Sequence, residues 1–350
     1  MYVDQFPAEG VAIEAQTVLR QGGGSCANTM VQLYKLGNGA ALCTVLGVDL
    51  EADIVEQDLF DNGVTTAFVL RGTQPTATKF TVQSARGNMT TISSKGGAGF
   101  DTSRISEKML SGITHVHLDG THMDAAIKLA SVASELGVTI SVHLTEVYPN
   151  VGELLKLADY VCTDDVFPQA MIGGISDNLE LCMCTVFETY CPKAKLMMAT
   201  LPTGGAVLLI GQNWSAEEQG PGTRCTPPSF PEGLFQRSQS LGYNWVGCKA
   251  WAALRSKAAT VDGEEGEAAA NAGEEAYDPV AVGDVQVAGF IHGVLQSYPL
   301  PMSILHGAVC AGMSSRKRGT RAGPSKEELH TEFPALTMVR ELQNESYLDS

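Results

Sequence analysis

The sequence has 350 residues, 44% of them hydrophobic, which is enough to bury a large core in one big α/β domain or two smaller ones. Its net charge of −16 at pH 7 argues against DNA or another polyanion as the main partner, because phosphate contacts need a basic surface. No apolar run approaches the roughly 20 residues that cross a bilayer, so the sequence predicts no membrane segment.

Helical and strand patterns alternate along most of the chain. In order, they predict a helix opened by a glycine turn at 22–37, a strand at 39–47, a helix at 49–63 and a strand-rich section from 65 to 93. Strands at 113–120, 138–144 and 159–165, helices at 122–137 and 150–158, and a strand pair within 195–211 follow. Strands separated by such helices imply a largely parallel sheet with helices on both faces.

The turns after these strands are the places to search for chemistry, because parallel sheets bind ligands beyond the carboxyl ends of their strands. The candidate turns lie at 20–28, 117–120, 162–165, 201–205 and 279–284. None of them has the P-loop pattern or the G-x-G-x-x-G dinucleotide pattern, which disfavours both of those nucleotide-binding modes.

The cysteines and histidines give no metal site. The nine cysteines are scattered and odd in number, which favours thiols in a reducing compartment, and Cys182, Cys184 and Cys191 lack a nearby histidine and a zinc spacing. His115 and His117 share one face of a predicted strand, where histidines are usually hydrogen-bonded.

Asp284 stands in "PVAVGDVQVAGF", directly after a turn of small residues and at the start of a helical pattern. Such a carboxylate commonly caps a helix, whose first turn carries unpaired N–H groups and partial positive charge. A second interpretation is a carboxylate that performs chemistry at an anion-binding helix start.

Several separated segments resemble the ribokinase or PfkB family of carbohydrate kinases, with the ketohexokinase-like branch as the nearest. They are "GGSCANTMVQLYKLG", "GVDLEADIVEQDLFDNGV", "ITHVHLDG", "LADYVCTDD", "VGDVQVAGFIHGVLQ" and "ILHGAVCAGM", and they occur in the family's order. The resemblance covers roughly residues 4–211 and 277–330. It implies an α/β, ribokinase-like three-layer fold with a largely parallel sheet and a small β lid, in a single domain over 1–330.

The resemblance implies a function and a catalytic turn. The function is ATP-dependent phosphorylation of a sugar hydroxyl, with ATP and Mg²⁺ as cofactors. Asp284 corresponds to the catalytic base, and the backbone N–H groups of Ala281, Val282 and Gly283 to an anion hole for the transferred phosphate.

Further site residues follow from the same resemblance. Gly23, Gly24, Asn28 and Asp119 correspond to sugar-binding positions, although Asn28 could equally cap a helix and the glycines could form an ordinary tight turn. Thr200, Gly204 and Gly312 resemble residues that line the nucleotide pocket. Strands within 8–21 and 64–95 resemble the lid, which excludes water from the sugar and in relatives often forms a homodimer contact.

The sequence also departs from the family pattern. The family's first strand, with its substrate-binding aspartate, has no counterpart before "MYVDQFPAEG"; Pro279 and Val280 precede an Ala-Val-Gly turn; and the magnesium-placing motif is reduced to Asp164 and Asp165. An acidic, irregular insert is expected at 212–276, with "YNWVGCKAWAALRSKAA" as a short helix in it, and a tail at 331–350.

The alternative function is a catalytically impaired relative that binds a sugar or nucleotide as a sensor or structural protein. A cytoplasmic location is expected, with an N-terminal targeting segment left open.

Overall fold

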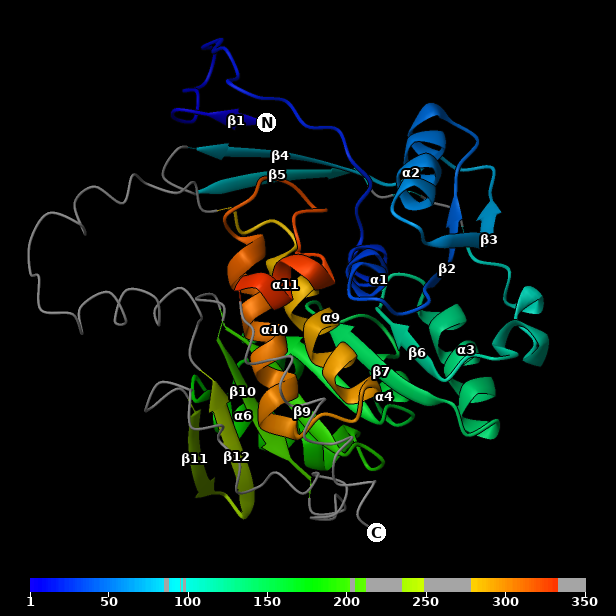
Figure 1. Cartoon of the computed structure of the whole chain (residues 1–350), viewed down its shortest axis with the longest axis vertical. Helices are drawn as coiled ribbons and strands as arrows, with labels where there is room; N and C mark the ends of the chain where they lie inside the picture. Colours follow the sequence, from blue (N-terminus) through cyan, green and yellow to red (C-terminus); the bar gives the residue numbers. More distant parts are fainter. Residues whose placement is uncertain are drawn as a thin grey trace, which may run out of the picture.

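A seven-stranded sheet forms the centre of the protein in the computed structural model (Figure 1). The structure describes residues 1–84, 88–94, 96, 99–201, 205–211, 235–248 and 278–332. The strand order is β11-β12-β10-β9-β8-β7-β6, and the pairings give five of the seven strands, β6 to β9 and β12, the same direction. The predicted largely parallel sheet is therefore confirmed.

The strands of this sheet fall close to their predicted ranges. They are β6 (His115–Leu118), β7 (Thr139–Leu144), β8 (Tyr160–Asp164), β9 (Leu196–Thr200), β10 (Ala206–Ile210), β11 (Phe235–Ser240) and β12 (Tyr243–Cys248). The strand pair predicted within 195–211 is the antiparallel pair β9–β10.

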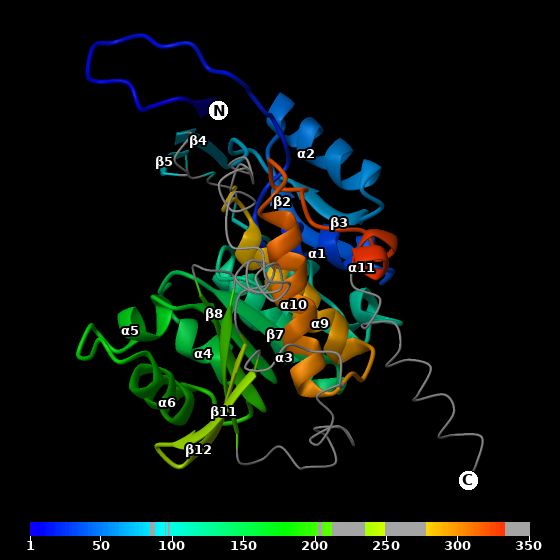
Figure 2. The same cartoon turned by 60° about the vertical axis from the view of Figure 1, so that its left-hand side comes forward.

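Helices cover both faces of the sheet. They are α1 (Ser25–Lys35), α2 (Leu50–Asp61), α3 (Met123–Glu135), α4 (Val151–Leu155), α5 (Phe167–Met171), α6 (Leu179–Tyr190), α9 (Val282–Leu295), α10 (Leu300–Ser314) and α11 (Lys326–Glu332), with short 3₁₀ helices at Thr102–Arg104 and Glu107–Leu110. Figure 2 shows α9 and α10 on one side of the sheet and α4 and α6 on the other. The architecture is thus the expected three layers.

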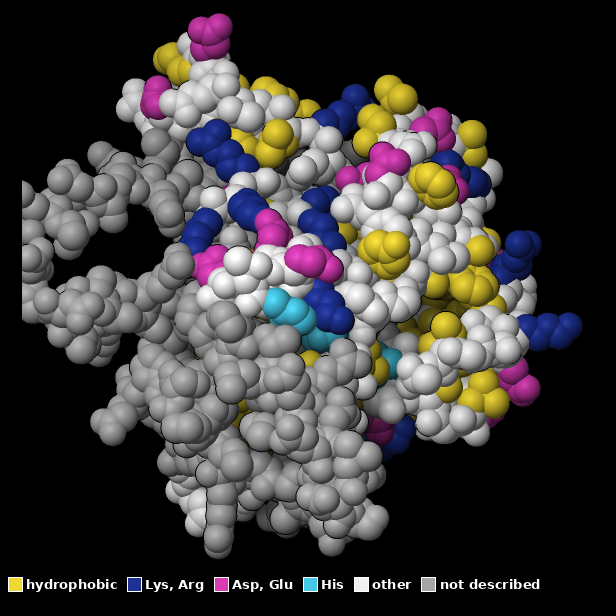
Figure 3. All heavy atoms as spheres, in the orientation of Figure 1, with side chains coloured by type: hydrophobic (Ala, Val, Ile, Leu, Met, Phe, Trp, Pro, Cys, Tyr) yellow, Lys and Arg dark blue, Asp and Glu magenta, His cyan; other side chains and the backbone are white. Residues whose placement is uncertain are grey.

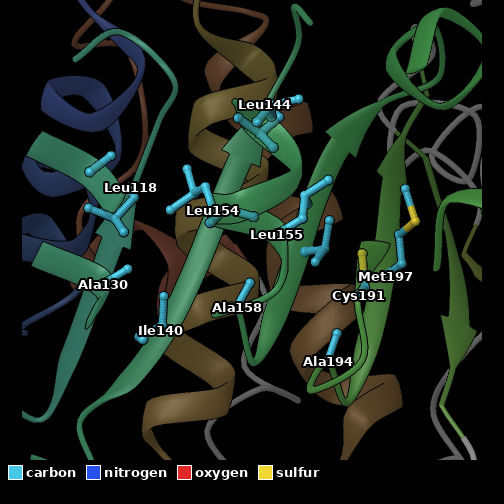
Figure 4. Close-up of a cluster of buried hydrophobic side chains, with 14 of the residues drawn as sticks. Leu118, Ala130, Ile140, Leu144, Leu154, Leu155, Ala158, Cys191, Ala194 and Met197 are labelled. Atoms are coloured by element: carbon cyan, nitrogen blue, oxygen red, sulfur yellow. The ribbon is translucent and has the colours of Figure 1, made fainter. Parts of the chain in front are cut away.

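Two hydrophobic cores result from the alternation of side chains along the strands. Tyr160, Cys162, Leu196 and Met198 face α9 and α10, whereas their neighbours in sequence face α3, α4 and α6. Figure 4 shows this second core, in which Ile140 and Leu144 of β7 lie near Leu154 and Leu155 of α4. No described helix is long and apolar enough to cross a membrane.

Two smaller sheets lie above the main one. The first joins β1 (Tyr2–Val3), β4 (Thr78–Ser84) and β5 (Met89–Ser94), and we call it the lid sheet; the second joins β2 (Ala41–Leu46) and β3 (Thr65–Arg71). Within 8–21, the region also expected to supply lid strands, the structure has a single isolated bridge, from Thr17 to Tyr2. β3 pairs with β2 instead of joining the lid sheet.

The lid sheet is tied to the turn before α9. The Tyr2 hydroxyl donates a hydrogen bond to the buried Asp278 carboxylate, which also accepts from the N–H groups of Gly319 and Val280. Burial, together with the Asp278 carboxylate, raises the pKa of Tyr2, so this hydroxyl stays a donor. The Arg318 guanidinium lies 4.5 Å from the centre of the Tyr2 ring.

Part of the predicted irregular insert is regular. Residues 235–248 form the hairpin β11–β12, which extends the main sheet from β10, and its turn places Leu241 and Gly242 at φ 51° and 79°. The sequence 243–248 is therefore a strand and not the start of the predicted helix. Its Trp245 and Val246 face opposite cores, a two-sided burial that hides the alternation used to recognise strands. The rest of 212–276 and the tail from 333 lie outside the described residues.

α9 and α10 approach so closely that their backbones touch at two glycines. A Cβ on Gly289 would stand 2.9 Å from both Gly307 Cα and His306 O, and one on Gly307 would stand 2.6 Å from Gln286 O. These atoms belong to backbone that cannot give way locally, so the crossing requires glycine at both positions.

We predict that Gly289→Ala lowers the free energy of unfolding by about 1–3 kcal/mol, the usual cost of overpacking a core. Chemical denaturation of the two forms measures it. Gly39→Ala is the matched control, because a Cβ there has nothing within 4 Å and its φ is not positive. An unchanged midpoint for Gly289→Ala would contradict the close crossing.

Candidate active site

Polar side chains collect at the carboxyl ends of four neighbouring strands. Asp119 follows β6, His143 is the penultimate residue of β7, and Asp164 and Thr200 end β8 and β9. The first turns of α1 and α9 reach this edge, where Ser25 contacts both His143 and Asp284. The candidate turns at 20–28, 117–120, 162–165 and 279–284 thus approach the same edge, as expected for a largely parallel sheet. The middle of the turn at 201–205 lies outside the described residues.

Asp284 lies in the first turn of α9, but it is not a cap of that helix. The N-cap residue is Ala281, in the left-handed region at φ 60°, and no side chain caps the helix. The Asp284 carboxylate instead faces α1, where Oδ1 accepts a hydrogen bond from Ser25 Oγ at 2.7 Å and Oδ2 accepts one from Asn28 Nδ2 at 2.7 Å. The capping interpretation from the sequence is therefore wrong.

His143 completes the surroundings of this carboxylate. Its Nδ1 atom lies 3.4 Å from Asp284 Oδ1 and 3.0 Å from Ser25 Oγ, and its side chain is 3% exposed. Neither Ser25 nor His143 was singled out from the sequence, because the pair is formed by positions 118 residues apart.

Asn28 is held in the orientation that serves Asp284. Arg321 Nη1 donates to Asn28 Oδ1 at 2.6 Å, which leaves the amide nitrogen to face the carboxylate. The same guanidinium pairs with Asp58 of α2, with Nε 2.8 Å and Nη2 2.7 Å from Asp58 Oδ2. Asn28 therefore links α9 to the C-terminal segment and does not cap α1.

Two of the three glycines in the turn before α1 are required by the structure. Gly24 is the N-cap residue of α1 at φ 96°, a conformation that side chains oppose. A Cβ on Gly22 would stand 2.5 Å from Asp58 Oδ2 and 2.6 Å from Arg321 Nη2. Gly23 has open space around it, as a position facing a ligand would, so its sugar-binding role stays a prediction.

Asp119 faces the start of α1. Its Oδ2 accepts from the Cys26 N–H at 3.3 Å and its Oδ1 from the Thr121 N–H at 2.9 Å. Burial, and then the carboxylates of Asp119 and Asp284, raise the pKa of the Cys26 thiol well above its usual value. Two carboxylates therefore lie near one neutral thiol. Of the predicted sugar-binding residues, Asp119 follows β6 and bonds the start of α1, whereas Asn28 lies within α1 and bonds Asp284.

One of the N–H groups of the predicted anion hole already has a hydrogen-bond partner within the chain. The Val282 N–H donates to Pro279 O at 3.3 Å, whereas those of Gly283 and Asp284 have no hydrogen-bond partner in the part of the chain that the structure describes. These two unpaired donors sit at the positive end of the α9 dipole, which favours an anion.

The predicted nucleotide residues belong to different elements. Thr200 is buried at the end of β9, where its hydroxyl donates to Thr163 O at 3.2 Å and lies 3.9 Å from the position of a Cβ on Gly283. Gly312 is buried inside α10, and its carbonyl accepts from Ser315 Oγ at 3.0 Å. Gly204 lies outside the described residues.

The Asp164 carboxylate accepts hydrogen bonds from the backbone that follows it. Its Oδ1 accepts from the N–H groups of Val166 and Phe167 at 3.2 and 2.7 Å, at the start of α5. Burial raises the pKa of this carboxyl, although these two N–H groups oppose the effect. Among the residues described, no cluster of three or more His, Cys, Asp and Glu side chains could hold a metal ion.

Two comparisons with known sequences match the N-terminal half of the chain. Residues 1–165 match the pfkB family carbohydrate kinase pattern. An ATP-dependent ribose-1-phosphate kinase from Halopiger xanaduensis is 28% identical over 167 residues, which span 47% of this chain and 56% of the relative, so the match covers little more than half the relative's length.

Solved structures match over nearly the whole chain. An Agrobacterium tumefaciens protein described as a putative ribokinase has a TM-score of 0.73 at 14% identity, covering 97% of this chain and 94% of its own. Arabidopsis thaliana ribokinase, solved with ribose and ATP, has a TM-score of 0.67 at 16% identity, covering 94% and 93%. A Sinorhizobium meliloti adenosine kinase has a TM-score of 0.63 at 18% identity, covering 91% and 83%.

The protein has the α/β fold of the ribokinases, as predicted from the sequence. More particularly, residues 1–165 are similar to the pfkB family of carbohydrate kinases. The comparisons include ribokinases and an adenosine kinase and do not single out the ketohexokinase-like branch.

We predict that Arg321→Met lowers the free energy of unfolding by about 3 kcal/mol, because it leaves the largely buried Asp58 carboxylate without its partner. Urea denaturation measures the change. Arg20→Met is the matched control, since the Arg20–Glu51 pair is exposed and such pairs contribute about 0–1 kcal/mol. Equal effects of the two substitutions would argue against the role of Arg321.

Proposed function

We propose that the protein is an ATP-dependent sugar kinase that transfers the γ-phosphoryl group to a sugar hydroxyl. The observation that carries this proposal is the Asp284 carboxylate, which lies at the carboxyl edge of the sheet beside the unpaired N–H groups of the α9 first turn. The pfkB family match and the ATP-dependent relatives support it.

Asp284 acts as the general base in this proposal. Each carboxylate oxygen has two acceptor positions, so Oδ1 can accept from Ser25 and from an incoming hydroxyl together. As the acceptor oxygen bonds to the γ-phosphorus, its proton passes to Asp284 and ADP leaves. The N–H groups of Gly283 and Asp284 stabilise charge on the transferred group.

The remaining predicted residues take binding roles. Asn28 and Asp119 carry the donors and acceptors that read sugar hydroxyls, and Gly23 leaves room for the ligand. ATP would be held on the Thr200 side of Gly283, with Gly204 and Gly312 as its other predicted contacts. Asp164 and Asp165, at and after the end of β8, are the carboxylates that would approach Mg²⁺, which would neutralise phosphate charge.

The sugar belongs, in this proposal, to the ketohexokinase- or fructokinase-like range, on the basis of the "GGSCAN" turn. The relatives add other acceptors, because their names include ribose, ribose 1-phosphate and adenosine. A panel of fructose, other ketoses, aldoses, ribose, ribose 1-phosphate and adenosine therefore tests the function as acceptor-dependent ADP release.

The second candidate is a catalytically impaired relative that binds a sugar or nucleotide. Ala281 favours it: in the predicted anion hole, a residue with a side chain occupies φ 60°, where glycine is the unstrained choice. Binding of sugar or ATP without ADP release across the whole panel would establish this candidate in place of the kinase.

A reducing compartment such as the cytoplasm fits the proposal, because no disulfide joins the described cysteines and most of their side chains are buried.

We predict that Asp284→Asn removes most of the acceptor-dependent turnover, about 10²–10⁴-fold, because general-base catalysis is lost. ATP affinity should stay nearly unchanged, since the substitution keeps the shape of the side chain. A coupled ADP-release assay and ATP titration measure the two quantities, with the exposed Asp124→Asn of α3 as the matched control. A variant that keeps more than half of the parent rate would refute the base assignment.

The lid sheet offers a surface for a homodimer. Phe80 and Ile92 are directly paired across β4 and β5, and their side chains are 63% and 73% exposed. Figure 3 shows hydrophobic side chains at the surface over the upper part of the molecule, where the lid sheet and α2 lie. We propose that this apolar pair joins two copies of the chain.

We predict that Phe80→Asp converts such a dimer to a monomer, because a charge cannot be buried in an apolar contact without a partner. Sedimentation equilibrium measures the oligomeric state. Phe60→Asp on α2 removes an equally exposed phenyl group, 71% accessible, and should leave the dimer intact. A monomeric parent protein, or dissociation by Phe60→Asp alone, would contradict the lid contact.

A further inference from the structure

His143 is a buried histidine whose polar contacts all lead to Asp284. It projects from β7 toward α1 and α9, on the face of the sheet opposite the Ile140, Val142 and Leu144 core. Its Nδ1 atom contacts Ser25 Oγ and Asp284 Oδ1, and its Nε2 atom is buried with no hydrogen-bond partner among the described residues. No packing of secondary structure explains a polar ring at this point.

The direction of the hydrogen bonds follows from counting protons. An ionised carboxylate only accepts, so the single hydroxyl proton of Ser25 is the one donated to Asp284 Oδ1. The contact between Ser25 Oγ and His143 Nδ1 must then be a donation from the imidazole. His143 Nδ1 therefore carries a hydrogen, and the chain of donors runs from His143 through Ser25 to Asp284.

Other charged and titratable groups also face this imidazole. Asp164, at the end of β8, and His117, on β6, are close enough for their charges to interact with His143. Burial, and then His143 and His115, hold the pKa of His117 well below its usual value, so His117 is a neutral neighbour. Asp284 is the carboxylate that approaches His143 within ion-pair distance.

We propose that His143 is a positioning residue for the phosphoryl-transfer reaction. It acts through Ser25: the Nδ1–H group orients the serine hydroxyl so that its proton points at Asp284 Oδ1, and this fixes the carboxylate with one acceptor position open toward the sugar. His143 gains and loses no proton in the reaction, since the proton of the sugar hydroxyl moves to Asp284. This inference rests on the proposed kinase function.

The kinetic test compares His143→Leu with His143→Asn. Leucine removes the group that orients Ser25, and kcat should fall about 10- to 100-fold, the loss expected when the charge-assisted Ser25–Asp284 hydrogen bond is no longer held in place. The pH below which kcat falls should also move upward, because a freely rotating Ser25 hydroxyl supports the charged form of the carboxylate less well. Asparagine places an N–H group near the position of Nδ1 and should restore much of the rate and the parent pH profile.

His117→Leu is the matched control, because it removes a neighbouring buried histidine that bonds Ser141 Oγ and not Asp284. It should leave the pH profile unchanged. A purely structural role for His143 would lower the melting temperature and the rate without moving the profile, and without rescue by asparagine. An unmoved pH profile in His143→Leu, or no rescue in His143→Asn, would overturn the proposal while leaving the kinase function in place.

A second measurement needs no turnover, and so separates this inference from the proposed function. In ¹⁵N-labelled parent protein at neutral pH, long-range ¹H–¹⁵N spectra of the histidines should show the His143 ring protonated at Nδ1. Asp284→Asn should shift these signals and leave those of His292, near the C-terminal end of α9, in place. A His143 ring protonated at Nε2 alone, or signals unmoved by Asp284→Asn, would refute the donor chain even in a protein without kinase activity.

Discussion

The half-buried carboxylate of Asp284 has to be matched by donors from elements that are distant in sequence, and the arrangement of the site depends on this requirement. An ionised carboxylate removed from water is costly unless each oxygen accepts hydrogen bonds. Here α1 supplies Ser25 and Asn28, and β7 supplies His143. α1 and α9 therefore cross in a register that brings their first turns together, and α9 also packs closely against α10 at Gly289.

The two helix starts reinforce one another electrostatically. Neither α1 nor α9 has a side-chain cap, so the partial positive charge of each N-terminus remains directed at the same space. A negative charge is favoured there whether it belongs to Asp284 or to a phosphate. The same helix starts that face the Asp284 carboxylate thus prepare the site for an anionic ligand.

Local sequence patterns predict much of the fold but less of the candidate site. Periodicity located α1, α2 and β6 to β10 because each has one clear apolar face or a short buried run. It missed β11 and β12, where Ser, Gln and Gly dilute the strand pattern. The resemblance to carbohydrate kinases identified Asp284 and Asn28, which the structure brings into direct contact.

Ser25, His143 and Arg321 went unrecognised for a physical reason. Each acts on a partner far along the chain, and no spacing rule links positions 25, 143 and 321 until the sheet is assembled. Gly22 is similar, since its requirement comes from Asp58 and Arg321 and not from its own turn. Local patterns report local geometry, whereas these residues are selected by contacts that exist only in the folded chain.

The position of Arg321 near the end of the described chain has a consequence for biosynthesis. A chain emerging from the ribosome presents α1, the sheet and α9 before residue 321 is available. Until then Asn28 lacks the donor that orients its amide, and Asp58 lacks its counter-ion. The nascent protein can therefore form its layers early, but Asn28 and Asp58 gain their common partner only after the segment that carries Arg321 has been made and has packed against α1 and α2.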